Sequence, residues 1–217
     1  MTTLTADSPS SNDGRGKKSG IRVFQSDLLE TFTHVHPILP LVMWGPVTLF
    51  FMYRSLFVHQ QSMPTFLGLI AFALFTWTVM EYTLHRWIFH IPARGKLSAR
   101  FQFIVHGLHH DDPNCKTRLV MPPVPAIILA IIFYPLFHLI FGSSYGDTFS
   151  AGFTVGYLAY DYTHYAIHHF RPRTRAGRYI KAYHMQHHCV DHDAKWGVST
   201  PLWDMILGTS GKKLTKY

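Results

Sequence analysis

The sequence predicts an all-α integral membrane protein with four transmembrane helices arranged as two hairpins. Three observations support this fold class: four long apolar segments, basic residues gathered on one side of those segments, and histidines gathered on the same side. A helix of about 20 apolar residues spans a bilayer core. The alternative is a soluble protein with four buried helices, but soluble helices usually carry a polar stripe, which these segments barely show.

The ends of the chain differ in composition from its middle. Residues 1–20 are rich in Ser, Thr, Gly, Asp and Lys, so we expect a disordered N-terminal tail that buries too little apolar surface to fold. At 21–33 a short amphipathic segment follows, where Ser26 or Asp27 can cap a helix and Glu30 stands near a capping-box position. Residues 211–217 are expected to form a C-terminal tail, which leaves one folded membrane domain at 21–210.

The apolar segments occupy residues 37–57, 63–84, 119–141 and 149–165. The short stretches 58–62 and 142–148 connect them in pairs, which favours two helical hairpins. Prolines at 122, 123 and 125 suit the start of the third helix, and Pro135 predicts a kink within it.

Basic residues are distributed on one side of these segments. Of the 20 Lys and Arg residues, 19 lie before the first segment, between the second and third, or after the fourth, and Arg54 is the exception. The positive-inside rule then predicts that both termini are cytoplasmic. The membrane would be the endoplasmic reticulum in a eukaryote or the inner membrane in a bacterium. Because the basic residues follow the topology, the net charge of +8 is not taken to indicate a nucleic-acid partner.

Sixteen residues are histidine, and most of them form four groups. The groups are His85-x4-His90, His106-x2-His109-His110, His164-x3-His168-His169 and His184-x2-His187-His188. Helical residues three or four apart share a face, so each HxxHH motif can converge on one point. His85 and His90 lie about 140° apart on a regular helix, so they converge only if the helix ends or bends between them.

A metal centre explains this clustering best, because repeated charging would destabilise clustered free histidines near neutral pH. Ten imidazoles exceed two tetrahedral zinc sites, so two ions of higher coordination fit better. Two Cys residues are too few for a Cys-ligated zinc site or cluster. Neither Glu30 nor Glu81 starts the Glu-x-x-His motif of a ferritin-like di-iron site.

Imidazole suits iron, zinc, copper and nickel alike. Two irons would activate dioxygen for oxidation of a C–H bond, whereas a zinc pair would hydrolyse. The sequence has no HExxH motif with a Glu base, and this favours oxidation. Carboxylates such as Asp161, Asp191, Asp193 and Glu81 are candidates for orienting ring nitrogens, or else are solvated charges and helix caps.

Several segments resemble the fatty acid 2-hydroxylases of the fatty acid hydroxylase superfamily, which also includes sterol desaturases and methyl oxidases. They are EYTLHRWIFH (81–90), HGLHHDDPNCKTRLVMPP (106–123), GYLAYDYTHYAIHH (156–169) and YHMQHH with GVSTPLWDMILGT (183–209). The His spacings are typical of the superfamily, while HHDDPNCKTRLVMPP and YDYTHYAIHH are typical of the 2-hydroxylase branch. The resemblance covers about residues 21–210.

The resemblance implies four transmembrane helices below a cytosolic helical cap that holds a histidine-bound dimetal site. It implies iron as the working metal, with zinc able to occupy the sites in purified protein, and dioxygen as co-substrate. The implied reaction is hydroxylation at C2 of a long-chain fatty acid, free or within ceramide and other sphingolipids. By motif match the metal ligands would be His85, His90, His106, His109, His110, His164, His168, His184, His187 and His188. His169 and Asp161 would support ligands without binding metal.

Many eukaryotic members of this family carry a fused cytochrome b5 domain, for which residues 1–20 are too short. We therefore expect a separate electron donor, such as cytochrome b5 or ferredoxin with its reductase. The alternative within the superfamily is a sterol or other lipid desaturase or oxidase. A membrane metal-transport protein is a further alternative, but it would need polar groups deep in the spans, where Glu81 and Asp161 are the acidic residues and both lie near the cytoplasmic end.

Overall fold

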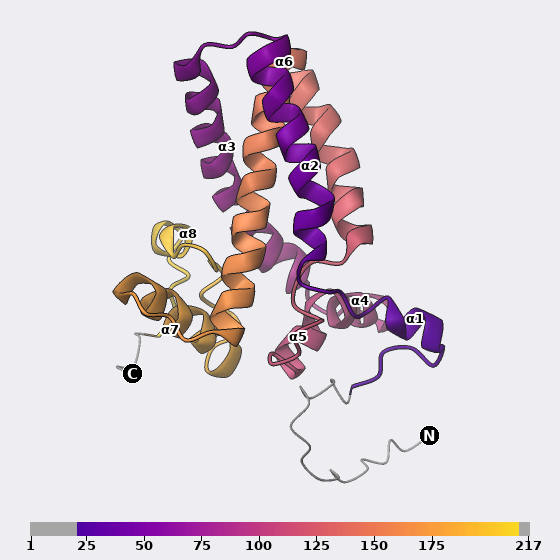
Figure 1. Cartoon of the computed structure of the whole chain (residues 1–217). Helices are drawn as coiled ribbons and strands as arrows, with labels where there is room; N and C mark the ends of the chain where they lie inside the picture. The colour runs from indigo at the N-terminus through magenta and orange to yellow at the C-terminus, as the bar shows by residue number, and fades with distance from the viewer. Residues whose placement is uncertain (1–20, 213–217) are drawn as a thin grey trace, which may run out of the picture.

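The computed structural model describes residues 21–212, and every regular element within that range is a helix (Figure 1). The expected tail at 1–20, and most of the one at 211–217, lies outside the described residues. The α-helices are α1 (Asp27–Thr31), α2 (Leu39–Tyr53), α3 (Met63–Thr83), α4 (Lys96–Gln102), α5 (Leu108–Asp111), α6 (Pro123–His169), α7 (Arg175–Cys189) and α8 (Leu202–Ile206). Three π-helical turns are η1 (Arg54–Val58), η2 (Leu84–Phe89) and η3 (Phe103–Gly107).

Three helices are long and apolar enough to cross a membrane: Leu39–Val58, Met63–Phe89 and Pro123–His169. Each π-helical turn directly continues an α-helix, so α2 runs into η1 and α3 into η2. Figure 1 shows α2, α3 and α6 in one bundle, with α4, α5, α7 and α8 gathered at one end of it.

The 47-residue helix α6 reverses direction at Gly142, where φ is 73° and ψ is 171°. The Tyr134 and Thr154 hydroxyl oxygens lie 2.7 Å apart, although 20 residues of straight helix would separate them by about 30 Å. Glycine is needed here because a residue with a β-carbon rarely adopts this conformation. The expected connection at 142–148 is therefore wrong in detail: one residue makes the turn, and helix resumes directly after it. Within α6 only Gly142 departs from helical angles, so the reversal is at Gly142, and the kink expected at Pro135 stays a prediction.

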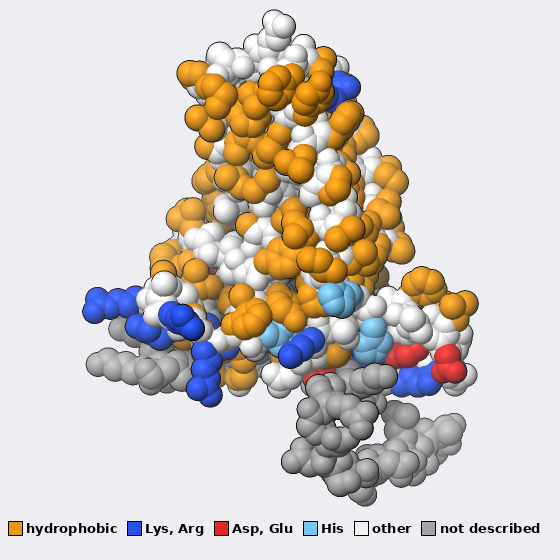
Figure 2. All heavy atoms as spheres, in the orientation of Figure 1, with side chains coloured by type: hydrophobic (Ala, Val, Ile, Leu, Met, Phe, Trp, Pro, Cys, Tyr) orange, Lys and Arg blue, Asp and Glu red, His pale blue; other side chains and the backbone are white. Residues whose placement is uncertain are grey.

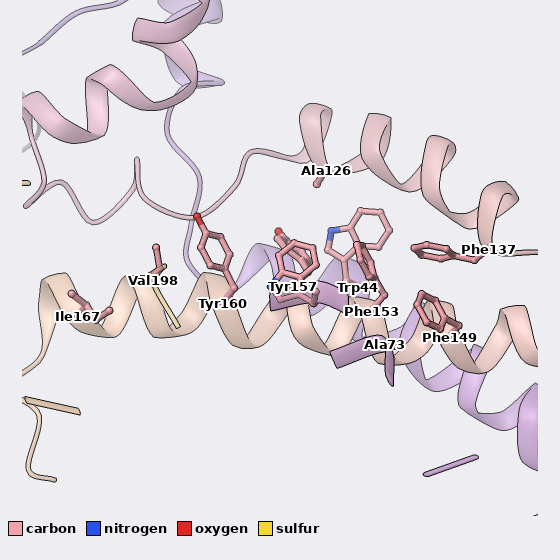
Figure 3. Close-up of a cluster of buried hydrophobic side chains, with 11 residues drawn as sticks. Trp44, Ala73, Ala126, Phe137, Phe149, Phe153, Tyr157, Tyr160, Ile167 and Val198 are labelled. Atoms are coloured by element: carbon pink, nitrogen blue, oxygen red, sulfur yellow. The ribbon is translucent and has the colours of Figure 1, made fainter. Parts of the chain in front are cut away.

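Small residues let the second arm of α6 approach α3 closely. A β-carbon on Gly152 would lie 2.8 Å from the Ala73 β-carbon, and one on Gly156 would lie 2.5 Å from that of Trp77. Close approach at small residues is the usual way that helices pack within a membrane. The two arms of α6 meet through aromatic rings, with Phe137 and Phe149 centroids 4.7 Å apart (Figure 3).

Apolar side chains cover the outside of the bundle, as Figure 2 shows. Large ones such as Leu49, Leu67 and Leu139 are exposed by 66%, 57% and 83%. Most basic side chains in this view gather at its lower end, around the short helices. A protein with this surface suits lipid around the bundle and water at the basic end.

Candidate metal centre

Ten histidines from four separate segments gather into two groups at the basic end of the bundle. Within each group the candidate ligand atoms lie within 4.8 Å of one another. The first histidine group is His85, His90, His106, His110 and His187, and the second is His109, His164, His168, His184 and His188. The groups adjoin, because the rings of His110 and His188 stack with centroids 4.1 Å apart. The structure thus brings together all ten residues that the sequence singled out.

A π-helical turn brings His85 and His90 together. The His90 N–H donates to the His85 carbonyl at 3.2 Å, which is the i to i+5 bond of a π-helix. Their ring centroids lie 5.1 Å apart. The expected end or bend between them is therefore a wider, π-helical turn that ends at Phe89, directly before His90.

Each HxxHH motif contributes to both groups, so the expectation that each would converge on one point is wrong. His106 and His110 enter the first group, and His109 between them enters the second. The other motif does the reverse, with His184 and His188 in the second group and His187 in the first. The first and last histidines of each motif are four residues apart, so they lie nearly one above the other on the helix. The middle histidine is three residues after the first, so its ring is turned toward the other group.

Backbone carbonyls fix the orientation of two rings in the first group. The His85 Nδ1 lies 2.5 Å from the Trp196 carbonyl oxygen, and the His187 Nδ1 lies 2.8 Å from that of Ala194. Because a carbonyl only accepts, each Nδ1 carries the proton and donates it. Each Nε2 then keeps its lone pair, and it faces another ring of the group at 3.1 Å (His106) or 3.2 Å (His90).

Burial keeps these rings neutral. It lowers the pKa of His90, His110 and His187 to about 3, with help from neighbouring histidines. Burial also lowers the pKa of His106, His109 and His184 well below the usual range. Neutral imidazole is the form that binds metal, so the ring nitrogens need not release protons first.

Several buried ring nitrogens have no hydrogen-bond partner among the described residues. Those within the two groups are His109 Nε2, His110 Nε2, His164 Nε2, His184 Nδ1 and His188 Nδ1. Unpaired buried polar atoms are rare and costly. Neutral imidazoles that converge in two sets of five, several of them with an unpaired buried nitrogen, fit two metal ions of high coordination.

The two residues expected to support ligands contact other atoms. Asp161 accepts the Met121 N–H at 3.2 Å and the Tyr157 hydroxyl at 3.3 Å. The ring of His169 lies against Tyr165, with centroids 4.5 Å apart, and belongs to neither group. Asp161 therefore positions the chain before α6 and the residue one turn earlier within α6.

Sequence reasoning missed the carbonyl oxygens of Ala194 and Trp196, which orient His187 and His85. A backbone carbonyl has no sequence signature, since every residue has one. From the sequence, Glu81 is one candidate for orienting a ring nitrogen, with a solvated charge or helix cap as the alternative. The structure shows instead that Glu81 is buried and accepts the N–H groups of Val198 and Ser199 at 2.6 and 2.8 Å.

The fold and these residues describe a helical membrane protein with a candidate dimetal centre, and comparisons with known proteins agree. A family model for fatty acid hydroxylases matches residues 70–209. The dihydroceramide fatty acyl 2-hydroxylase FAH1 of Arabidopsis thaliana is 34% identical over 88% of this chain and 81% of its own length. The fatty acid 2-hydroxylase of Rattus norvegicus is 34% identical over 87% of this chain, which spans 56% of that enzyme.

A solved structure, described as full-length Scs7p with only the hydroxylase domain visible, has the same fold. It matches with a TM-score of 0.81 and 31% identity over 88% of this chain and 73% of that one. The chain belongs to the fatty acid hydroxylase family, and it is a membrane-associated oxidoreductase of lipid metabolism.

Proposed function

We propose that this protein is a fatty acid 2-hydroxylase with two iron ions, which acts on long-chain acyl groups in free fatty acids or ceramide. The observation that carries the proposal is the convergence of ten histidines into two groups of five at the end of a membrane-capable bundle. The names of the plant and rat relatives, both 2-hydroxylases, support the reaction and its position.

The ligands proposed for one ion are the five residues of the first histidine group, and those for the other ion are the five of the second. Bound iron would supply the redox chemistry that activates dioxygen, while zinc can occupy the same imidazoles in purified protein. The chain itself contributes neutral rings, two of them held by the Trp196 and Ala194 carbonyls. Fixing the rings in advance keeps the reorganisation on metal binding small.

An apolar cavity within the bundle suits the acyl chain. It is partly open to the outside and is lined by aromatic and aliphatic side chains from α2, α3, both arms of α6 and the segment before α6. Leu84, which lines it, directly precedes His85. An acyl chain held there would exclude water and present its carboxyl end, with C2 next to it, toward the first histidine group.

We infer four membrane crossings from the reversal of α6 at Gly142, which divides it into two antiparallel arms. Each arm is then a span of its own, beside α2 and α3. The positive-inside rule supports cytoplasmic termini, since the basic residues gather at the end that carries the histidines. The short helices there would form a cytosolic cap.

Hydroxylation consumes electrons that neither substrate provides: one oxygen atom enters the C–H bond, and the other leaves as water with two electrons and two protons. We therefore propose a separate electron donor, of the cytochrome b5 or ferredoxin type, with its reductase. Exposed arginines between α6 and α7, such as Arg171 and Arg173, lie close in sequence to His168 and would attract an acidic carrier.

The test is lipid mass spectrometry of cells that express the protein, with metal analysis of the gently purified chain. We expect 2-hydroxy fatty acids or 2-hydroxyacyl sphingolipids, about two ions per chain, and loss of product in His109→Ala and His187→Ala. A new double bond or an altered sterol would instead indicate a desaturase or oxidase of the same superfamily. Unchanged lipids with iron and a reductase present would contradict both.

A further inference from the structure

The loop between α7 and α8, residues 190–201, contacts the first histidine group through hydrogen bonds and rings. Its Ala194 and Trp196 carbonyls accept from His187 and His85, which are both members of that group. In the second group, by contrast, the Nδ1 atoms of His184 and His188 have no partner among the described residues. The two groups therefore differ in how their rings are held.

Two buried carboxylates from outside the loop hold it in place. Glu81 of α3, which is 2% exposed, accepts the Val198 and Ser199 N–H groups at 2.6 and 2.8 Å and also the Ser199 hydroxyl. Asp204 of α8 is fully buried. It accepts the N–H groups of Trp196 and Gly197 at 3.0 and 2.8 Å, and the Thr209 hydroxyl at 2.7 Å.

The loop fits closely against these carboxylates. A β-carbon on Gly197 would lie 2.0 Å from the Thr200 carbonyl oxygen and 3.1 Å from Asp204 Oδ2. The two carboxylates thus receive four consecutive backbone N–H groups, from Trp196 to Ser199. The Trp196 carbonyl shares a peptide plane with the Gly197 N–H. Because Asp204 accepts that N–H, the direction of the carbonyl toward His85 is fixed as well.

We propose that Glu81 and Asp204 are positioning residues for one metal ion only, the ion of the first histidine group. They act through the loop, whose carbonyls set the tautomer and ring orientation of His85 and His187. This inference rests on the two-metal centre proposed above. Loss of a group that orients a metal-binding histidine typically lowers metal affinity by 10- to 100-fold, so disturbing this loop should weaken one ion and spare the other.

The two carboxylates allow a matched pair of substitutions. Each oxygen of the Asp204 carboxylate accepts a backbone N–H. In Asp204→Asn, either orientation of the amide therefore places its NH₂ against one of these N–H groups, and that hydrogen bond is lost. In Glu81→Gln the amide oxygen can keep both backbone bonds at the Oε1 position, and the NH₂ can donate to the Ser199 hydroxyl oxygen. Glu81→Ala removes all of these bonds. The proposal thus expects Glu81→Gln to behave as wild type, and the other two variants to be impaired.

The experiment loads the full-length chain with Zn²⁺ in detergent and counts ions per chain as the concentration of a chelator rises. Wild type and Glu81→Gln should release both ions over the same range. Asp204→Asn and Glu81→Ala should release one ion at a chelator concentration lower by about tenfold or more. In Asp204→Asn, adding His184→Ala should remove the remaining ion, while adding His187→Ala should not.

Asp147→Asn is the control for general loosening, because Asp147 is a buried carboxylate that accepts from Arg54, His59 and His138, none of which belongs to a histidine group. It should keep both ions.

If both ions leave together in Asp204→Asn or Glu81→Ala, or if Glu81→Gln matches Glu81→Ala, the proposal is wrong. If Asp204→Asn does not fold, the Glu81 pair decides alone. Wild type with fewer than two ions would overturn the two-metal centre as well, whereas two ions with unaltered release in the variants would overturn this inference only.

Discussion

Neighbouring histidines in this protein serve different groups, and this is the main lesson at the residue scale. His109 and His110 are adjacent in sequence, yet one belongs to the second histidine group and the other to the first. The sequence singled out all ten members of the two groups from their spacing and from their resemblance to a known family, and their role as metal ligands stays a prediction. It could not predict the partition, because that depends on how four segments are placed around two centres in space.

The partition predicts a pattern in double substitutions. His109→Ala with His184→Ala removes two ligands of one group, so we expect about one ion per chain to remain. His109→Ala with His110→Ala removes one ligand from each group, so both ions should be held more weakly and lost on dialysis against a chelator. Elemental analysis after dialysis checks this, and equal metal loss in the two double variants would contradict the partition.

At the element scale, local departures from the regular α-helix build the site and the fold. The turn η2 adds one residue to a helical turn and so brings His85 and His90 to the same side. Gly142 reverses α6 within one residue. The apolar segments followed from the sequence, and so did the pairing of the two arms of α6, whereas α2 and α3 both pack against α6 and not as a hairpin on each other. Helix periodicity assumes regular geometry and does not indicate where a π-helical turn or a one-residue reversal occurs.

Substitution of Gly142 tests the reversal of α6. Its φ of 73° with ψ of 171° lies in a region that is essentially restricted to glycine, so Gly142→Ala should destabilise the protein by about 1–3 kcal/mol. We expect a lower thermal unfolding temperature with both metal ions retained.

Gly68→Ala is the matched control, because Gly68 lies in α3 and a β-carbon there would meet nothing within 4 Å. It should unfold at or slightly above the wild-type temperature. If the two variants unfold at equal temperatures, position 142 accepts a side chain without backbone strain, and the prediction is wrong.

At the scale of the whole molecule, an apolar bundle carries the two histidine groups at one end and a polar cluster at the other. At that other end Asp147 of α6 accepts from Arg54, the exceptional basic residue, and from His59 and His138. The sequence predicted that basic residues would gather at one end of the bundle, as Figure 2 shows. It did not predict that Asp147 would pair with Arg54, because the two are 93 residues apart.

Accessibility of cysteines tests the orientation. Ser143 is exposed beside the reversal of α6, and Cys189 is exposed at the end of α7, while Cys115 is buried. In sealed membrane vesicles of known sidedness, an impermeant thiol reagent should label Cys189 from the cytoplasmic side. The double variant Ser143→Cys, Cys189→Ser should be labelled only from the opposite side. Labelling of both positions from one side would contradict four crossings.

Metal removal tests how the centre is coupled to the rest of the molecule. A ligand that binds only the folded state stabilises it, so chelator-treated protein should unfold at a lower temperature. Because α2, α3 and α6 pack through apolar residues away from most of the histidines, we expect circular dichroism to show that most of the helix remains at room temperature. Loss of the helical signal on chelation would mean that the bundle needs the metal to fold.

The most direct single measurement is the fate of labelled dioxygen. Iron-loaded protein, a long-chain acyl substrate and an electron donor with its reductase would be incubated under ¹⁸O₂, and the product analysed by mass spectrometry. A two-iron 2-hydroxylase gives a product with one ¹⁸O atom at C2, and none when His109 or His187 is replaced by Ala. An oxygen atom at another carbon, or one drawn from water, would contradict that reaction, as would the absence of product from protein that holds two irons.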